Sequence, residues 1–336
     1  MKRIVLFLAA TVLFSPLFAQ KATKKKKSKE VTHVIGTWTR GLQLYGGLTQ
    51  VGNNNWYSTG SDKFFLTTNG TLDAWLKNSW KNKSWTVGLN AAYGMQNTTK
   101  HGPIKLNDRL ELSTKMLIMP KQWKKWSWGP MVQLRTQFSN GYFYNYMDEP
   151  DVKRRRSGFF APAFVYASPI GLNFKPNKAI NIYMTPLMAR WTIVTNQPYS
   201  YYAQGGVYKG NAENSLASLY NVSPVSQHRG EFGLFAKLNI QQDIMKNIQY
   251  KSKLEMFANY VNGYKTTLPG RFVNVDWFMT NQVEFKVNKV ISVRYNLDIM
   301  YEDDMKQPNW NAIKLPTQSV GLQMLSTLGV GVKGMW

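Results

Sequence analysis

The sequence contains no cysteine, so we expect neither a disulfide framework nor a lipoprotein anchor. Histidine is almost as rare, with three residues in 336. Acidic residues are scarce too, since 18 Asp and Glu stand against 42 Lys and Arg, for a formal net charge of +24. Beyond the N-terminal segment there is no apolar run near the roughly 20 residues that a transmembrane helix needs, which argues against a helical membrane protein.

The N-terminus has the pattern of a cleavable secretory signal. Lys2 and Arg3 form a basic start, residues 4–14 are apolar, and Ala19 provides the small residue of a cleavage site. The apolar stretch is too short for a membrane anchor, so residues 1–19 are predicted to be a signal peptide. Residues 20–34 then form a basic periplasmic tail, either a solubilising spacer or an electrostatic contact with a negative envelope component.

In a cytosolic protein this positive charge would suggest nucleic acid, but export argues against that partner. We expect the anionic partners to be outer-membrane lipid and lipopolysaccharide. The barrel assembly machinery would be met during insertion, and other envelope proteins are a further option. No cofactor is expected.

The sequence is rich in aromatic residues, at 14 %, and its apolar side chains recur at every second position from Thr37 onward. The clearest case is Ser84–Gly94, where one face carries Trp85, Val87, Leu89, Ala91 and Tyr93. A period of two is typical of a β-strand, because a helix would scatter these side chains over several faces.

This period predicts twelve strands, most of them longer than the 9–11 residues that a tilted strand needs to cross a bilayer. They lie near 37–51, 63–77, 84–96, 106–118, 127–138, 158–174, 179–193, 229–243, 249–261, 273–286, 290–301 and 317–333. The sequence therefore predicts an all-β fold, a transmembrane antiparallel up-and-down barrel of about 12 strands over residues 35–336.

The connections between these strands alternate in length. Short ones are predicted at 81–83, 119–126, 175–178, 244–248 and 287–289. Long ones are predicted at 52–62, 97–105, 139–157, 194–228, 262–272 and 302–316. Outer-membrane barrels have short periplasmic turns and longer extracellular loops, and a soluble sandwich gives no reason for such alternation.

Tryptophans flank the first two short turns, as expected of an interfacial aromatic girdle: Trp75, Trp80, Trp85, Trp123, Trp126 and Trp128. Trp336 at the end of the last strand resembles a folding signal for barrel assembly. Arg40 and Arg190 share faces with apolar neighbours, so we expect both to face lipid near strand ends and to snorkel.

Several segments together resemble a family of Bacteroidota outer-membrane barrels known only as a domain of unknown function. They are Val51–Trp56, Ser84–Gly94, Lys105–Lys115, Phe160–Lys178, Thr185–Val194, Arg229–Phe235, Lys251–Tyr260 and Val275–Trp277. The resemblance extends over roughly residues 35–333 and implies a barrel fold and an outer-membrane location. It carries no catalytic residues, because none is assigned in that family.

Few residues suggest chemistry. His33, His101 and His228 are expected at the surface, and Ser226–His228 lacks the surroundings of a phospholipase site. The pair Asp303–Asp304 lacks the context of an outer-membrane protease, and Glu302–Asp304 is expected to be a solvated loop rather than a Ca²⁺ site. Residues 148–156 are expected to pair with one another, with lipopolysaccharide phosphates as the alternative partner. The sequence thus predicts no enzyme.

The inward strand faces carry more information. The charged side chains predicted to line the lumen are Arg109, Glu111, Lys115, Arg135, Arg229, Glu231, Lys237, Lys251, Lys253, Glu255, Asp276, Glu284, Lys286, Arg294 and Asp298. Basic residues exceed acidic ones by three in this set. The third and last strands present small inward residues instead, among them Gly88, Asn90, Ala92, Gly329 and Gly331.

These features favour a narrow, porin-like channel for small polar or anionic solutes in the outer membrane. The alternative is a non-conducting structural or accessory barrel of an envelope assembly or secretion complex, which the lysine-rich tail favours slightly. Twelve strands lie between the eight that side chains can fill and the sixteen that leave a channel, so the sequence leaves the lumen undecided.

Overall fold

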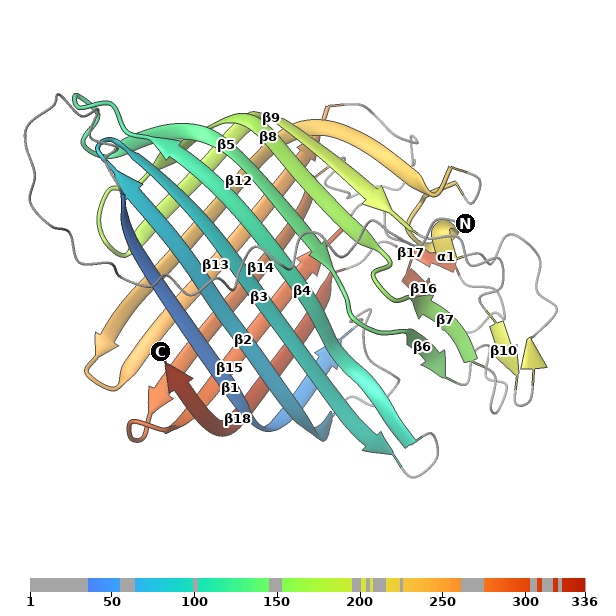
Figure 1. Cartoon of the computed structure of the whole chain (residues 1–336). Coiled ribbons are helices and arrows are strands. Elements are labelled where there is room, and N and C mark those ends of the chain that lie inside the picture. The colour runs from blue at the N-terminus through green and yellow to red at the C-terminus, as the bar shows by residue number, and fades with distance from the viewer. Residues whose placement is uncertain are drawn as a thin grey trace, which may run out of the picture. The chain divides into compact units, whose positions relative to one another are not determined.

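Twelve strands form one closed antiparallel barrel in the computed structural model (Figure 1). The structure describes residues 36–54, 64–98, 102–144, 153–194, 201–203, 206–207, 216–223, 226–260, 275–302, 307–309, 317–319 and 322–335. Each barrel strand pairs with the next barrel strand along the chain, and the first closes on the last. The predicted twelve-stranded up-and-down barrel is therefore confirmed.

The barrel strands are between 11 and 18 residues long. They are β1 (Thr37–Asn54), β2 (Phe64–Trp80), β3 (Lys83–Thr98), β4 (Gly102–Ile118), β5 (Trp126–Thr136), β8 (Ala163–Phe174), β9 (Ile180–Ile193), β12 (His228–Met245), β13 (Ile248–Asn259), β14 (Val275–Lys286), β15 (Ile291–Tyr301) and β18 (Gln323–Met335).

Smaller elements lie within the long connections. A four-stranded sheet has the order β11 (Gly206–Val207), β10 (Tyr201–Ala203), β7 (Lys153–Ser157), β6 (Gly141–Tyr144), and a second pair joins β16 (Gln307–Asn309) to β17 (Thr317–Ser319). The one-turn helix α1 spans Leu216–Leu219. Among the described residues, no helix is long and apolar enough to cross a membrane.

The two ends of the barrel differ. At the short-turn end the strands are joined by residues 81–82, 119–125, 175–179, 246–247 and 287–290. At the other end, here called the long-loop end, lie the small elements described above (Figure 1). The five predicted short turns are thus confirmed.

Three predicted boundaries were wrong. The connection at 97–105 is not long, because β3 and β4 extend until Thr98 pairs with Gly102. Strand β8 begins at Ala163 rather than 158, because Gly158 and Ala161 close a tight turn through two backbone hydrogen bonds. Residues 317–319 pair with 307–309 and not with the barrel.

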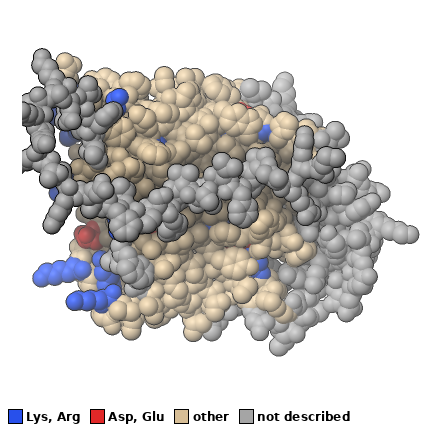
Figure 2. Space-filling model, viewed as in Figure 1, with Lys and Arg blue, Asp and Glu red and all other residues tan. Residues whose placement is uncertain are grey.

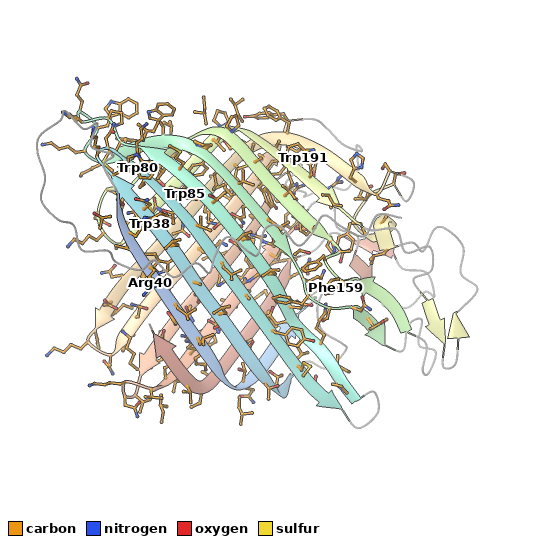
Figure 3. The ribbon with its side chains drawn as sticks, in the orientation of Figure 1. Trp38, Arg40, Trp80, Trp85, Phe159 and Trp191 are labelled. Carbon is orange, nitrogen blue, oxygen red and sulfur yellow. The ribbon has the colours of Figure 1, made fainter. Side chains whose placement is uncertain are left out.

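The outward face is apolar along the strands. Leu48, Leu112, Leu234 and Val330 expose 58 %, 46 %, 44 % and 56 % of their surface. Figure 2 shows few charged atoms along the visible side of the barrel, while Lys and Arg gather at the short-turn end. Arg40 lies outward near the start of β1, as predicted (Figure 3).

Tryptophans stand near the short-turn end of this band. Trp38 and Trp85 meet edge to face at 6.3 Å, and Trp80 lies beside them (Figure 3). Trp75 departs from the predicted girdle. It lies on the inward face of β2, where a Cβ on the inward Gly41 would come within 2.5 Å of its Nε1.

The prediction that Arg190 faces lipid was also wrong, since 3 % of this residue is exposed and its side chain lies inside the barrel. The register slips between β9 and β12 beside Pro186, so that Thr185 and Met188 both point inward. Proline cannot donate a ladder hydrogen bond, which favours a bulge at this point. A bulge of one residue moves every later side chain to the other face.

Hydroxyl groups form hydrogen bonds with backbone groups at this irregularity in β9 and at the neighbouring one in β8. The Thr185 hydroxyl donates to the carbonyl of Ile170 at 2.6 Å and accepts from the backbone N–H of Leu187 at 3.1 Å. The hydroxyls of Ser168 and Thr185 lie 2.8 Å apart. These contacts replace ladder bonds lost beside Pro169 and Pro186.

Candidate functional site: the barrel lumen

A cluster of five charged side chains crosses the lumen between strands that are not neighbours. Lys253 Nζ on β13 lies 2.9 Å from Glu111 Oε1 on β4 and 2.9 Å from Glu255 Oε1. Lys237 Nζ on β12 lies 2.7 Å from Glu255 Oε1 and 3.6 Å from Glu111 Oε1. Arg135 on β5 contacts both carboxylates. We call these five residues the lumen bridge.

The lumen bridge connects opposite walls. In the strand order of the barrel, β4 and β13 are separated by β5, β8, β9 and β12 on one side and by six strands on the other. Separating charge-assisted pairs that are shielded from water costs free energy, so both partners are held in place. The bridge therefore divides the interior into two lobes.

The lobe beside β5, β8, β9 and β12 is filled by side chains, and we call it the filled lobe. Its packed core consists of Met131, Tyr166, Tyr183, Met188, Phe235 and Phe257. All of these residues are at most 7 % exposed. Large inward side chains leave no room for a path along this wall.

A second ion-pair cluster stabilises the filled lobe toward the long-loop end. Arg190 Nε donates to Glu231 Oε2 at 2.8 Å, and its Nη1 donates to Asp276. Arg229 Nη2 lies 3.2 Å from the same Glu231 oxygen. The Arg190 guanidinium also lies 4.3 Å from the centroid of the Phe257 ring. Arg190 therefore belongs with the lumen residues, although its sequence neighbours suggested otherwise.

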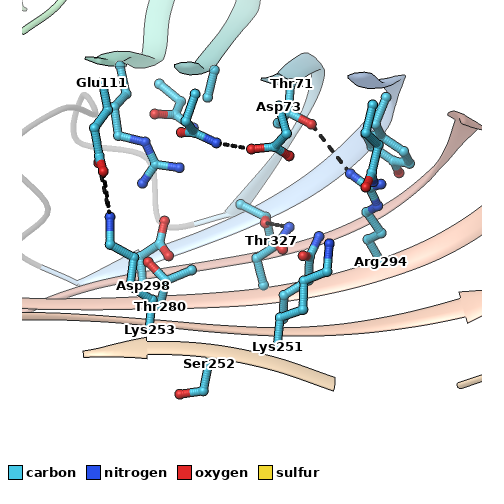
Figure 4. A pocket seen from close by; sticks show the side chains of 18 of the residues that line it. Thr71, Asp73, Glu111, Lys251, Ser252, Lys253, Thr280, Arg294, Asp298 and Thr327 are labelled. Atoms are coloured by element: carbon cyan, nitrogen blue, oxygen red, sulfur yellow. Dashed lines mark hydrogen bonds and ion pairs between the residues drawn. The ribbon is translucent and has the colours of Figure 1, made fainter. Parts of the chain in front are cut away.

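The lobe beside β1, β2, β3, β14, β15 and β18 holds a cavity of about 610 Å³, and we call it the cavity lobe. Figure 4 shows its polar lining. Lining residues include Gln43, Asn69, Thr71, Asp73, Asn90, Ala92, Asn107, Arg109, Lys251, Thr280, Gln282, Arg294, Asn296, Asp298, Thr327 and Gly329. Among the small inward residues predicted on the third and last strands, Asn90, Ala92 and Gly329 border the cavity.

One wall of the cavity lobe is a stack made possible by glycine. A Cβ at Gly331 would lie 2.7 Å from the Tyr45 ring, so only glycine lets Tyr45 lie against β18. The Arg294 guanidinium then lies 3.9 Å from the Tyr45 ring centroid. Arg294 Nη2 is 3.5 Å from Glu284, and Nη1 reaches the Thr71 hydroxyl at 3.4 Å. Arg294 is thereby held at the edge of the cavity.

Apolar side chains narrow the cavity lobe toward the long-loop end. Leu106, Phe278, Met300 and Leu325 form a buried cluster that spans β4, β14, β15 and β18. Leu325 also lines the 610 Å³ cavity, while a pocket beside Phe278 and Met300 has only about 50 Å³. We call these four residues the apolar constriction, since they lie between the cavity and the long-loop end.

The remaining predicted lumen residues are also inside. Lys115 Nζ donates to Asn173 Oδ1 at 3.1 Å, and Lys251 lines the cavity. Lys286 pairs across the strand with Ser292, which is 2 % exposed and therefore points inward. All fifteen lie on the inward side of their strands, and five of them form the lumen bridge.

Sequence reasoning missed inward Asp73 and a buried lysine. Asp73 accepts a hydrogen bond from Asn90 inside the cavity lobe. Lys105 Nζ donates to Asp108 at 3.0 Å, to Gln137 at 2.9 Å and to the carbonyl of Ser139 at 2.7 Å.

The residues weighed for catalysis are only partly described. The Ser226 hydroxyl donates to the carbonyl of His228 at 3.1 Å, while His228 Nδ1 lies 2.7 Å from the carbonyl of Ser226. Within the described ranges, no group of three or more acidic or histidine side chains could hold a metal ion. Residues 1–35, His101, 148–152 and Asp303–Asp304 lie outside the described residues.

The solved structures most similar in arrangement are barrels of low identity. The NanC porin aligns with a TM-score of 0.40 and 10 % identity over 86 % of this chain and 98 % of that chain. Outer membrane phospholipase A from Escherichia coli gives 0.38 and 10 % over 86 % and 95 %. A Pseudomonas aeruginosa FadL homologue gives 0.33 and 9 % over 88 % and 90 %.

These scores identify no function, and the barrel fold is established by the strand pairing itself. No curated protein sequence matches the chain. A family model described as "Protein of unknown function (DUF3078)" matches residues 48–142, a part of the range over which a resemblance to an uncharacterised family was expected. The protein is thus a closed twelve-stranded barrel whose residues 48–142 match the model of a family of unknown function.

Proposed function

We propose that this protein resides in the bacterial outer membrane and forms a narrow, porin-like channel for small polar or anionic solutes. The observation that carries the proposal is the cavity lobe, a polar space of about 610 Å³ inside a barrel whose outward face is apolar. Polar lumen and apolar exterior are the arrangement of barrels that conduct solutes through a membrane.

In this proposal the short-turn end faces the periplasm and the long-loop end faces the medium. Residues 1–19 would direct export, and the basic tail would remain in the periplasm. Epitope tags within 139–157 or 194–228 should then be reached by antibody on intact cells, whereas a tag at 81–83 should not. Reversed labelling would contradict the orientation.

In this channel the apolar constriction would limit the passage of water and ions between the cavity and the long-loop end. Hydrophobic constrictions stop conduction by excluding water. Phe278→Ala and Leu325→Ala remove apolar volume between the cavity and the long-loop end, so they should raise single-channel conductance in planar bilayers. Leu234→Ala, on the outward face, is the matched control and should leave conductance unchanged.

The second candidate is a non-conducting barrel that serves an envelope assembly. The lumen bridge favours it, because ion pairs that connect opposite walls make the barrel rigid and narrow its lumen. Folded protein that is silent in bilayers, with and without Phe278→Ala, would contradict the channel. Co-purification of stoichiometric partners from native membranes would then support the accessory role.

A further inference from the structure

The cavity lobe brings together polar atoms that no described residue satisfies. Buried atoms without a hydrogen-bond partner in the described part of the chain include Tyr45 Oη, Asn69 Oδ1, Arg109 Nε and Arg294 Nε. Beside them, the Thr280 hydroxyl and the Asp298 carboxylate contact each other. All six residues line the same cavity. Because buried polar groups are nearly always paired in folded proteins, such a cluster marks a place built for a polar ligand.

These atoms require donors and acceptors from their ligand. Arg109 and Arg294 can only donate, whereas the Asn69 and Asp298 oxygens accept. The hydroxyls of Tyr45 and Thr280 can do either. A molecule with several hydroxyl groups around a ring offers both kinds of partner in several directions, which a simple anion or an apolar solute does not.

The charge around the cavity favours a negative group on that molecule. Five basic and three acidic side chains line it, namely Arg109, Lys237, Lys251, Lys253 and Arg294 against Asp73, Glu111 and Asp298. Two of the acids are already engaged, since Glu111 contacts Lys253 and Asp73 accepts from Asn90. The Nε atoms of Arg109 and Arg294 have no partner among the described residues, although Arg294 Nη2 lies 3.5 Å from Glu284, and they offer donors suited to a carboxylate.

An aromatic surface borders the short-turn side of the same cavity. Trp75 lines it and is 45 % exposed. Its ring lies over Gly41, where any larger side chain would collide with it. A flat, half-exposed indole offers apolar area to the C–H groups of a sugar ring and retains an N–H donor.

We propose that the cavity lobe binds an acidic sugar of monosaccharide or disaccharide size, held by Arg109 and Arg294 at its carboxylate and by Asn69, Thr280 and Asp298 at its hydroxyls. The cavity volume of about 610 Å³ is in the usual range for such ligands. This inference rests on the proposed function, since it takes the sugar to be the solute that enters the channel.

Equilibrium dialysis of the purified, folded full-length protein in detergent with labelled glucuronate tests the proposal. Glucuronate should bind, and glucose and inorganic phosphate should each compete at least about tenfold less well, because each lacks half of the required groups. Arg109→Gln and Asn69→Ala should weaken glucuronate binding by about tenfold or more. Arg40→Gln removes the same charge from the outward face and should leave binding unchanged.

The outcomes separate this inference from the channel. Conduction without glucuronate binding would overturn the acidic-sugar site and leave the channel standing. Binding that is lost in Arg109→Gln, in a protein that does not conduct, would support the site and contradict the channel. Equal competition by glucose or by phosphate would overturn the assignment to an acidic sugar, as would equal binding by Arg109→Gln and Arg40→Gln.

Discussion

On the β5, β8, β9 and β12 side of the lumen, aromatic and methionine side chains pack into a buried core. On the β1, β2, β3 and β18 side, small and polar residues such as Thr71, Asn90, Ala92 and Gly329 line a cavity, with Tyr45 and Trp75 among them. Both sides belong to the same twelve-stranded sheet. Strand number therefore does not determine whether the lumen of a barrel of this size contains open space. The volume of the inward side chains determines it, and that volume differs between the two sides.

The largest effect is expected at the boundary between the lobes. Glu255→Gln would leave Arg135, Lys237 and Lys253 without one of their two carboxylates, and breaking a buried ion pair costs about 3–5 kcal/mol. Asp73→Asn in the cavity lobe, where open space adjoins the side chain, should cost about 1 kcal/mol or less. Urea unfolding of both variants in lipid vesicles measures the difference, and equal losses would contradict a division of the lumen at the bridge.

A smaller effect is expected where the barrel meets lipid. Leu89→Arg and Leu234→Arg place a charge toward hydrocarbon and should each lose about 2–4 kcal/mol of unfolding free energy. Asn90→Arg points into the cavity, next to Asp73, and should be much milder. Should Asn90→Arg prove as harmful as Leu89→Arg in the same unfolding assay, the register of β3 would be wrong.

The smallest effect concerns ion selectivity. The lining of the cavity lobe carries two more basic than acidic residues, so we expect mild anion selectivity that weakens in high salt. Lys251→Glu should move the reversal potential in a salt gradient toward cations. Lys286→Glu is the inward control outside the cavity lining and should shift it less. A cation-selective wild-type protein would contradict the channel as described.

The sequence was sufficient for the strands and for their inward charges, because the period of two persists through most of the chain. It failed where the period breaks. An unbroken alternation along β9 predicts that Arg190 faces lipid, but the bulge beside Pro186 turns Arg190 inward. A proline within a strand, as in Thr185-Pro186, is a sequence signal of such a bulge. Trp75 was placed in the girdle by its distance from the turn alone, although its place opposite Gly41 puts it on the inward face.

The division of the lumen could be predicted only in outline. Small inward residues on the third and last strands indicated that side chains fill less of the lumen there. The alternation of basic and acidic residues along β12 and β13 indicated ion pairs between them. That Glu111 and Lys253 meet across the barrel depends on the tilt and stagger of strands that are 142 residues apart in sequence. No local pattern encodes that distance.

The absence of cysteine in the natural sequence makes the two lobes directly measurable. Single cysteines at Asn69, Asn90 and Asn296 in the cavity lobe, and at Met131, Gln133 and Thr185 in the filled lobe, can be tested in folded protein in liposomes with a small, charged thiol reagent. The division of the lumen predicts rapid labelling of the first three, with block of conductance, and protection of the last three until the barrel is unfolded. Equal labelling of both sets would contradict it.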